Sequence, residues 1–371
     1  MTTLLPSPLT SRRPTRTVSV GGVTIGGNNP VRVQSMTNTD TRDIPATMAQ
    51  IRALAGAGCE IVRLAVLDVE AALALKTLCD QTPTPLIADI HFDSRLAVMA
   101  VEAGVRGLRI NPGNIGGADK VDRVVHAARA ARVPIRIGVN SGSVDKDLLR
   151  KHGGPTPEAM VESALAHVRL LEERGFHDIK ISLKSSSVLG TVGAYRLMSR
   201  TVDYPLHIGV TEAGTAMRGA VKSSVGLGIL LAEGIGDTLR VSLTADPVEE
   251  MLVAWEILRA LGLRARGPEI VSCPTCGRTE IGLMELAEAV EKRLRGVEEV
   301  FTVAVMGCVV NGPGEAREAD IGVAGGRDSG LIFRKGEVVR KVKGKAELLP
   351  VFMEELEKFL DERRGGAQPT A

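Results

Sequence analysis

The chain has 371 residues, more than one hydrophobic core usually holds, so its length favours two domains. A formal net charge of +2 and an aromatic content of 2% argue against nucleic-acid binding, which uses strongly basic faces or base-stacking platforms. No apolar stretch reaches the length of about 18 residues that a membrane-spanning helix requires.

The first residues, MTTLLPSPLTSRRPTRT, contain Arg, Ser and Thr but no acid. This composition occurs in organelle transit peptides, but a disordered tail over residues 1–16 is the simpler interpretation. The run lacks the apolar centre of a secretory signal. Five cysteines, an odd number, do not indicate a disulfide framework in a chain of this length. We therefore expect a cytoplasmic protein.

Residues 31–260 repeat one pattern, in which a short β-rich run is followed by turn residues and a longer helical segment. The β-rich runs are VRVQSMT, EIVRLAV, LIADIHF, GLRINP, PIRIGVN, DIKISLKS, PLHIGVTE and TLRVSLT. Eight such units predict an α/β fold, a (β/α)8 barrel of the TIM type, across residues 17–266. A doubly wound open sheet is the alternative, but eight regular units favour closure.

Side chains on a strand alternate between its two faces, so the runs also predict which residues enter the barrel. In PIRIGVN, the apolar set Ile135, Ile137 and Val139 is expected to pack on the outer helices. The opposite set, taken over all strands, is polar and mostly basic. It comprises Arg63, Asp89, His91, Arg109, Asn111, Arg136, Gly138, Asn140, Lys180, Ser182, Lys184, His207, Gly209, Thr211, Arg240, Ser242 and Thr244.

Such an interior is unusual, because TIM-type barrels are normally filled with branched apolar residues. Buried Arg and Lys side chains without partners are costly, and the few inward acids cannot neutralise this many bases. We therefore expect an anionic ligand inside the barrel or at its mouth. Guanidinium groups suit phosphate oxygens, which predicts a phosphorylated or diphosphorylated small molecule. Alternatively, the bases pair with backbone carbonyls and acidic loop residues as part of the structure.

The remaining sequence, residues 267–363, predicts a small α+β domain, and residues 364–371 a second disordered tail. Two segments have helical patterns, GRTEIGLMELAEAVEKRLRG and AELLPVFMEELEKFLDERR. Four have strand patterns, VEEVFTVAVMGC, ADIGVAGG, SGLIFRKG and EVVRKVKG.

This second domain contains three cysteines in a pattern that suggests a metal centre. Cys273 and Cys276 form a CxxC, and Cys308 lies in a Gly-rich segment that continues to Glu315. A closed structural zinc site needs a fourth Cys or His, but no histidine follows His207. Three thiolates and one weaker carboxylate suit a [4Fe–4S] cluster with one iron open to substrate. A catalytic zinc with three protein ligands remains open.

The other two cysteines, Cys59 and Cys79, fall in the barrel, before its second strand and at the end of the following helix. Barrel active sites form at the opposite ends of the strands. Both are therefore interpreted as buried small hydrophobic residues.

Several blocks together resemble the 4-hydroxy-3-methylbut-2-enyl diphosphate synthase family of the methylerythritol phosphate pathway of isoprenoid biosynthesis. They include SMTNTDTRD, ADIHF, RINPGNIG, IRIGVNSGS, HIGVTEAG, GIGDTLRVSL, CPTCGR and VAVMGCVVNGPGEAREADIGVAGG. The resemblance covers about residues 17–363 in the shorter, bacterial two-domain layout. It implies an oxidoreductase that reductively opens the ring of 2-C-methyl-D-erythritol 2,4-cyclodiphosphate, with loss of water, to (E)-4-hydroxy-3-methylbut-2-enyl diphosphate.

The resemblance also implies the cofactor and the residues that act. Two electrons pass through a [4Fe–4S] cluster whose iron ligands are Cys273, Cys276, Cys308 and an exchangeable Glu315. Glu212 is implied near the reacting carbons, where it supplies or organises a proton or, alternatively, neutralises neighbouring bases. The implied substrate-binding residues are Arg63, His91, Arg109, Arg136, Asn140, Lys184, Thr211, Arg240 and Ser242.

Flavodoxin or ferredoxin is the implied electron donor, and no nucleic acid or membrane is involved. The implied assembly is a homodimer in which the barrel of one chain and the cluster domain of the other close each site. One segment, SLKSSSVLGT, departs from the family, which usually has an acid near the position of Ser187.

Three other functions compete with the reductive synthase. A zinc-dependent hydrolase or lyase acting on a phosphorylated small molecule would use the same three thiolates. A barrel transferase of the pterin-binding type would carry the second domain as a structural metal module. An iron–sulfur sensor is disfavoured, because a sensor does not need a basic barrel interior.

Overall fold

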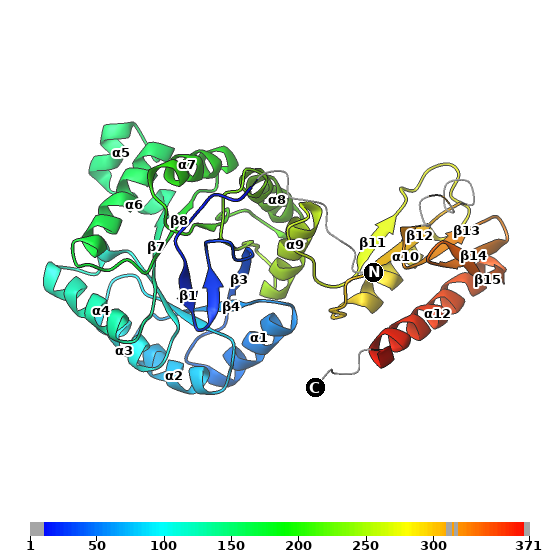
Figure 1. The fold of residues 1–371 in the computed structure, drawn as a ribbon, viewed down its shortest axis with the longest axis horizontal. Helices are drawn as coiled ribbons and strands as arrows, with labels where there is room; N and C mark the ends of the chain where they lie inside the picture. The colour runs from blue at the N-terminus through cyan, green and yellow to red at the C-terminus, as the bar shows by residue number, and fades with distance from the viewer. Residues whose placement is uncertain (1–10, 309–313, 315–317, 367–371) are drawn as a thin grey trace. The chain divides into compact units, whose positions relative to one another are not determined.

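The computed structural model describes residues 11–308, 314 and 318–366. The described chain forms two compact units, the first ending at Ala265 and the second beginning at Arg266 (Figure 1). None of the helices in these ranges is both long and apolar enough to cross a membrane.

The first unit is a barrel of parallel strands, and each predicted β-rich run forms one of them. The strands are β3 Arg32–Met36, β4 Ile61–Ala65, β5 Leu86–Asp89, β6 Gly107–Ile110, β7 Ile135–Asn140, β8 Ile179–Lys184, β9 His207–Ile208 and β10 Thr238–Leu239. Their order is β8-β7-β6-β5-β4-β3-β10-β9, and a parallel bridge between Ile181 and Leu206 joins the two ends. The predicted (β/α)8 barrel is confirmed.

Helices surround these strands as an outer ring (Figure 1). They are α1 Ile44–Gly56, α2 Val69–Asp80, α3 Ser94–Glu102, α4 Ala118–Ala130, α5 Lys146–His152, α6 Pro157–Glu172, α7 Val188–Thr201, α8 Ala216–Ala232 and α9 Pro247–Ala260, with 3-10 turns η1 Pro112–Asn114 and η2 Ser141–Ser143. Side chains at several helix starts accept a backbone N–H and so fix where the helix begins, as Thr156 does for α6 and Asp246 for α9.

Strand parity separates an apolar outer face from a polar inner one, as predicted. Ile135, Ile137 and Val139 are buried in the same hydrophobic core as helix residues such as Val124 and Met160. The basic residues between them on the strands point the other way, into the barrel. Because the apolar residues are buried on the outer face, the residues that alternate with them must face the interior.

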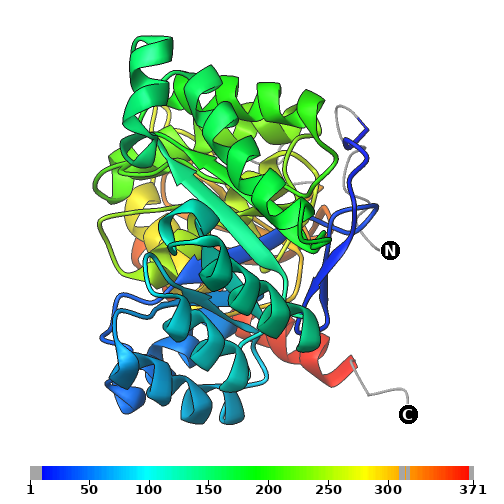
Figure 2. The same ribbon diagram turned by 90° about the vertical axis from the view of Figure 1, so that its left-hand side faces the viewer.

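The bottom of the barrel is closed by a hairpin of β1 Val18–Val20 and β2 Val23–Ile25. Val18, Val20 and Ile25 form a separate apolar cluster with Ile61 and Ile87, which lie near the starts of β4 and β5. Figure 2 shows the hairpin, in blue, lying across one end of the barrel. The opposite end, where the strands finish, is where TIM-type barrels place their active sites.

Residues 11–16 differ from the expected disordered tail, which was extended to residue 16. Arg12 donates to Asp237 at 2.7 Å, and Arg13 donates to the carbonyls of Ser199 and Tyr204 at 2.9 and 2.6 Å. Guanidinium groups that bridge several acceptors of the barrel hold this segment in place. The predicted disordered tail is therefore too long at its C-terminal end, because these arginines bind the barrel instead of remaining in solvent.

The second unit contains a five-stranded sheet in the order β11-β12-β13-β14-β15. Its elements are β11 Glu269–Ser272, α10 Leu283–Leu294, β12 Thr302–Met306, β13 Ile321–Gly325, β14 Ser329–Arg334, β15 Glu337–Lys343 and α12 Lys345–Gly366. Both helices contribute to one apolar core, which includes Leu286, Val290, Phe352 and Leu356. β11 is additional to the predicted strands, and α12 runs past residue 364, where the second tail was expected to begin.

Candidate active site

The basic side chains predicted to bind substrate lie close together in the barrel. Each of four bases has a pKa that is lowered by burial and then by the positive charge of others in the set, which shows that they are close. The four are Arg63, His91, Arg136 and Lys184, and the bases that act on them include Arg109 and Arg240. They come from different strands, because parallel strands present equivalent positions at the same height: Arg109 stands opposite Arg136, and Asn140 opposite Lys184. Arg136 is only 1% exposed and therefore lies inside the barrel, whereas His91 is exposed.

One carboxylate, Asp89, is shared by several of these bases. It lies 3.2 Å from Nη1 of Arg109, 3.5 Å from Nε of Arg63 and 3.9 Å from Nε2 of His91. Burial alone would raise the pKa of Asp89, but Arg63, Arg109 and Arg136 outweigh it and hold that pKa below its usual value. Strand parity predicted Asp89 inside the barrel but not this central role.

Two of the bases, Arg63 and Lys184, have lowered pKa values despite the presence of Asp89. Burial, with a partly compensating attraction from Asp89, lowers the pKa of Arg63 to about 10. Burial and then repulsion from Arg136 and Arg63 lower the pKa of Lys184 well below its usual value. A bound anion would relieve both effects, because its negative charge would stabilise the cations in place of the water that burial has removed.

Two glycines leave room for this cluster. A Cβ on Gly138 would come within 2.5 Å of Nε of Arg109, and one on Gly209 within 3.1 Å of Nζ of Lys184. Both glycines belong to the predicted inward set, so the parity pattern places small residues beside the large charged ones.

The uncharged predicted residues and Glu212 lie where the strands end. Asn140 and Lys184 are the last residues of β7 and β8, and the backbone of Thr211 donates to Ser185 at 3.3 Å. The backbone N–H of Asn140 donates to the hydroxyl of Ser143 at 3.0 Å at the start of η2, a structural role that sequence alone did not indicate. Glu212 is exposed and has a φ of 52°, a conformation that is uncommon for residues other than glycine and is concentrated at functional sites.

A second carboxylate, Glu250, reaches the cluster from a helix and was not predicted. It is 2% exposed, sits in the first turn of α9, and lies 3.3 Å from Arg240. A signal was present in the sequence, because Glu250 falls in the same helical stripe as the buried Met251, Ala254 and Leu258. A charged residue within an apolar stripe indicates a buried partner.

Further polar side chains lie in the barrel interior outside the predicted substrate set. Gln34, Lys180 and His207 are at most 1% exposed. Burial and then repulsion from Arg136 lower the pKa of Lys180 to about 7. Among the described residues, Lys180 Nζ and His207 Nε2 have no hydrogen-bond partner. The polar interior therefore extends beyond the residues predicted to contact substrate.

The cysteines of the second unit follow two adjacent parallel strands, β11 and β12. Cys273 follows β11, and its Sγ accepts the N–H of Gly307, the residue before Cys308, at 3.1 Å. Backbone and then side-chain hydrogen bonds from Arg278 lower the pKa of Cys276. These are features of thiolates that bind metal, whose sulfurs accept N–H donors. Within the described ranges, however, no three His, Cys, Asp or Glu residues form a ready metal-binding group.

Glu315, the predicted fourth ligand, lies outside the described residues. Ser187, where the family pattern is broken, is the N-cap of α7 and accepts the N–H of Gly190 at 3.1 Å. Serine and aspartate are comparable N-caps, so this departure preserves the start of the helix.

Cys59 is buried as predicted, whereas Cys79 is only partly buried. Both pack in or against the barrel core, and burial raises the pKa of Cys59 to about 12 and that of Cys79 to about 11. Neither thiol is activated as a metal ligand.

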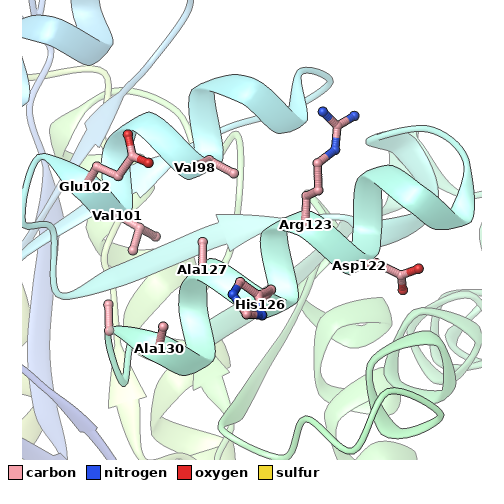
Figure 3. A pocket seen from close by; sticks show the side chains of 9 residues that line it. Val98, Val101, Glu102, Asp122, Arg123, His126, Ala127 and Ala130 are labelled. Carbon is pink, nitrogen blue, oxygen red and sulfur yellow. The ribbon is translucent and has the colours of Figure 1, made fainter.

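A separate groove of about 770 Å³ lies between α3 and α4 (Figure 3). Val98, Val101, His126 and Ala127 are among its lining residues. None of the residues that line it belongs to the predicted site.

Comparison with known proteins gives full-length matches. The model of the GcpE TIM-barrel domain matches residues 15–255, and that of the GcpE protein C-terminal domain matches residues 269–358. A protein of Maridesulfovibrio salexigens named 4-hydroxy-3-methylbut-2-en-1-yl diphosphate synthase (flavodoxin) is 71% identical over 355 residues, which is 96% of this chain and 99% of that protein. Proteins of the same name match from Nitratidesulfovibrio vulgaris (68% identity, covering 97% and 93%) and Geobacter sulfurreducens (63%, covering 94% and 99%).

Proposed function

The chain belongs to the GcpE family, and from this premise we propose that it catalyses the reaction of 4-hydroxy-3-methylbut-2-en-1-yl diphosphate synthases. The reaction is the reductive ring opening and dehydration of 2-C-methyl-D-erythritol 2,4-cyclodiphosphate in isoprenoid biosynthesis. The observation that carries the proposal is the group of buried bases around Asp89. A zinc-dependent hydrolase is not favoured, because the high identity extends over nearly the whole chain of the named synthases.

The barrel residues would bind the cyclodiphosphate through its phosphate groups. Arg63, Arg109, Arg136, Lys184 and Arg240 provide donors from separate strands, so they can surround two phosphates and fix the orientation of the ring. His91, Asn140, Thr211 and Ser242 are proposed to complete the contacts at the strand ends. The bases lose water on burial, and each therefore interacts more strongly with an anion than it would in solvent.

Glu212 is proposed to supply or organise the proton that accompanies loss of the hydroxyl group as water. Its exposure and its position after β9 give it access to a ligand at the barrel mouth. Its uncommon backbone conformation supports a functional role.

We propose that the thiols hold a [4Fe–4S] cluster, which is supported by the N–H that Cys273 accepts from Gly307, the residue before Cys308. Cys273, Cys276, Cys308 and, from the sequence, Glu315 would hold it. When bound, such a cluster would relay the two electrons of the reduction and supply a Lewis-acidic iron. The contribution of the chain is to hold the thiolates and to donate backbone N–H groups to their sulfurs.

Flavodoxin is the proposed electron donor, in agreement with the names of the relatives.

We also propose a cytoplasmic homodimer in which each barrel is completed by the second unit of the other chain. Only a short segment separates the end of α9 at Ala260 from β11 at Glu269. That segment starts at the bottom of the barrel, since helices of this fold run back from the strand ends. A monomeric species with full activity would exclude the shared site.

The central experiment is anaerobic purification followed by iron and sulfide analysis. We expect roughly four irons per chain, broad absorbance near about 400 nm, and turnover of the cyclodiphosphate with a chemical reductant. A colourless protein with one bound zinc, inactive on this substrate, would refute the proposal.

A further inference from the structure

Glu250, which the sequence analysis did not assign to the site, makes four hydrogen bonds to residues in and around the candidate substrate site. One oxygen, Oε2, accepts the hydroxyl of Ser35 at 2.8 Å and Nε of Arg240 at 3.3 Å. The other, Oε1, accepts Nη2 of Arg240 at 3.3 Å and the backbone N–H of Leu243 at 3.1 Å. Each carboxylate oxygen therefore has two donors, which is close to its full capacity.

These four contacts connect three segments of the barrel. Ser35 lies on β3, Arg240 follows β10, and Leu243 lies in the loop that continues from β10 past Ser242. β3 and β10 are neighbouring strands. The position of Glu250 is itself fixed, because Asp246 caps α9 by accepting the N–H of Val248 at 2.9 Å.

The geometry determines which donors of Arg240 are left for a ligand. A guanidinium has five N–H donors in a rigid plane, and Glu250 engages Nε and one donor of Nη2. Nη1 contacts only a weak acceptor in the described structure, the thioether of Met36, at 3.7 Å. The edge formed by Nη1 and the second donor of Nη2 can therefore receive two oxygens of one phosphate group.

We propose that Glu250 is a positioning residue for substrate binding: it holds the Arg240 guanidinium so that its outer edge faces a phosphate group of the cyclodiphosphate, and it fixes the loop that carries Ser242. This inference rests on the proposed function. Glu250 does not touch substrate itself, and its effect on the reaction passes through Arg240 and Ser242.

The test compares Glu250→Gln with Glu249→Gln, which removes the same charge one residue earlier in the same helical turn. The introduced amide has nearly the shape of the acid but cannot accept both Arg240 donors. We expect the KM for the cyclodiphosphate to rise roughly 10-fold, with kcat changed less than about threefold. Glu249→Gln should resemble the wild type in both constants.

Inorganic diphosphate gives a readout that does not depend on turnover. Calorimetric titration should show a Kd about 10-fold weaker for Glu250→Gln and unchanged for Glu249→Gln. Arg240→Ala should weaken binding at least as much, and adding Glu250→Gln to it should cost less than about twofold more. A purely structural role would instead weaken binding equally in both backgrounds, and that result would overturn the inference.

Arg240→Lys provides a second test that keeps Glu250. Lysine preserves the charge but has no planar fork to hold, so diphosphate affinity should fall nearly as far as in Arg240→Ala. Full affinity in Arg240→Lys would contradict the inference, as would wild-type KM and Kd in a folded Glu250→Gln. If the wild type binds diphosphate through Arg240 but does not turn over the cyclodiphosphate, the proposed function fails while the role of Glu250 stands.

Discussion

The Oδ1 atom of Asp89 lies 3.2 Å from Nη1 of Arg109, and the two residues stand opposite each other on neighbouring strands β5 and β6. We predict that Asp89→Asn destabilises the ligand-free protein by about 3–5 kcal/mol, because it leaves several buried bases without their shared acid. Chemical denaturation measures this loss, and inorganic diphosphate should recover part of it. Asp119→Asn, on the exposed face of α4, should cost little.

The same carboxylate predicts an acid limit. The pKa of Asp89 is lower in the folded protein than its ordinary value of 3.8. Its contribution to stability is therefore fully present above that value and is lost as pH falls through the folded pKa. Asp89→Asn should remove this part of the acid destabilisation, and an unchanged acid profile would show that Asp89 is not stabilised by its neighbours.

Glu212→Gln should lower kcat by roughly 10²–10⁴-fold while the KM changes little, because an amide can neither give nor take the proton. Single-turnover kinetics with the reduced enzyme measures the chemical step directly. Equal iron content in the variant and the wild type serves as the control. A raised KM with normal kcat would instead assign Glu212 to balancing the charge of the neighbouring bases.

Cys308→Ser should abolish iron and sulfide binding together with activity, because a serine oxygen is a poor ligand for this soft centre. Cys79→Ser is the matched control, since that thiol lies in the barrel and is not activated. Elemental analysis after anaerobic reconstitution separates the two. Full cluster content in Cys308→Ser would exclude this cysteine as a ligand.

Glu315→Ala tests the fourth ligand. We expect a weaker cluster or loss of turnover, while the barrel keeps its melting transition, because Glu315 is proposed to be the exchangeable ligand. Circular dichroism, iron content and activity measured on one preparation distinguish these effects. Normal turnover in this variant would show that no exchangeable Glu315 ligand is needed.

Lys180 predicts a second dependence of stability on pH, with the same sign as that of Asp89 but in a higher pH range. Burial lowers its pKa from 10.5 to about 7, so the unfolded chain binds the extra proton between these values. This lysine should therefore make unfolding free energy rise with pH across that window, by up to about 1.4 kcal/mol per pH unit. Lys180→Met should reduce the rise and stabilise the protein at pH 7, whereas Lys222→Met on α8 should do neither. An unaltered slope in Lys180→Met would show that Lys180 stays charged when folded.

The barrel was predictable because its strands carry a strong local signal. Alternation between apolar and polar residues in IRIGVN places Arg136 inside without knowledge of any contact, and the structure buries it. Strand periodicity cannot report a residue that reaches in from outside the strands, which is why Glu250 was missed. The short strand β11 was missed because only four residues form it and most of them are exposed.

The hairpin at the bottom of the barrel has a consequence for the order of events in turnover. Val20, Ile25 and Ile87 seal that end with hydrocarbon, which a diphosphate cannot cross. The barrel is thus closed to diphosphates at one end, and both substrate and product must pass through the other end. The product must dissociate from the arginines before the next substrate binds, so product and substrate compete for the same binding site.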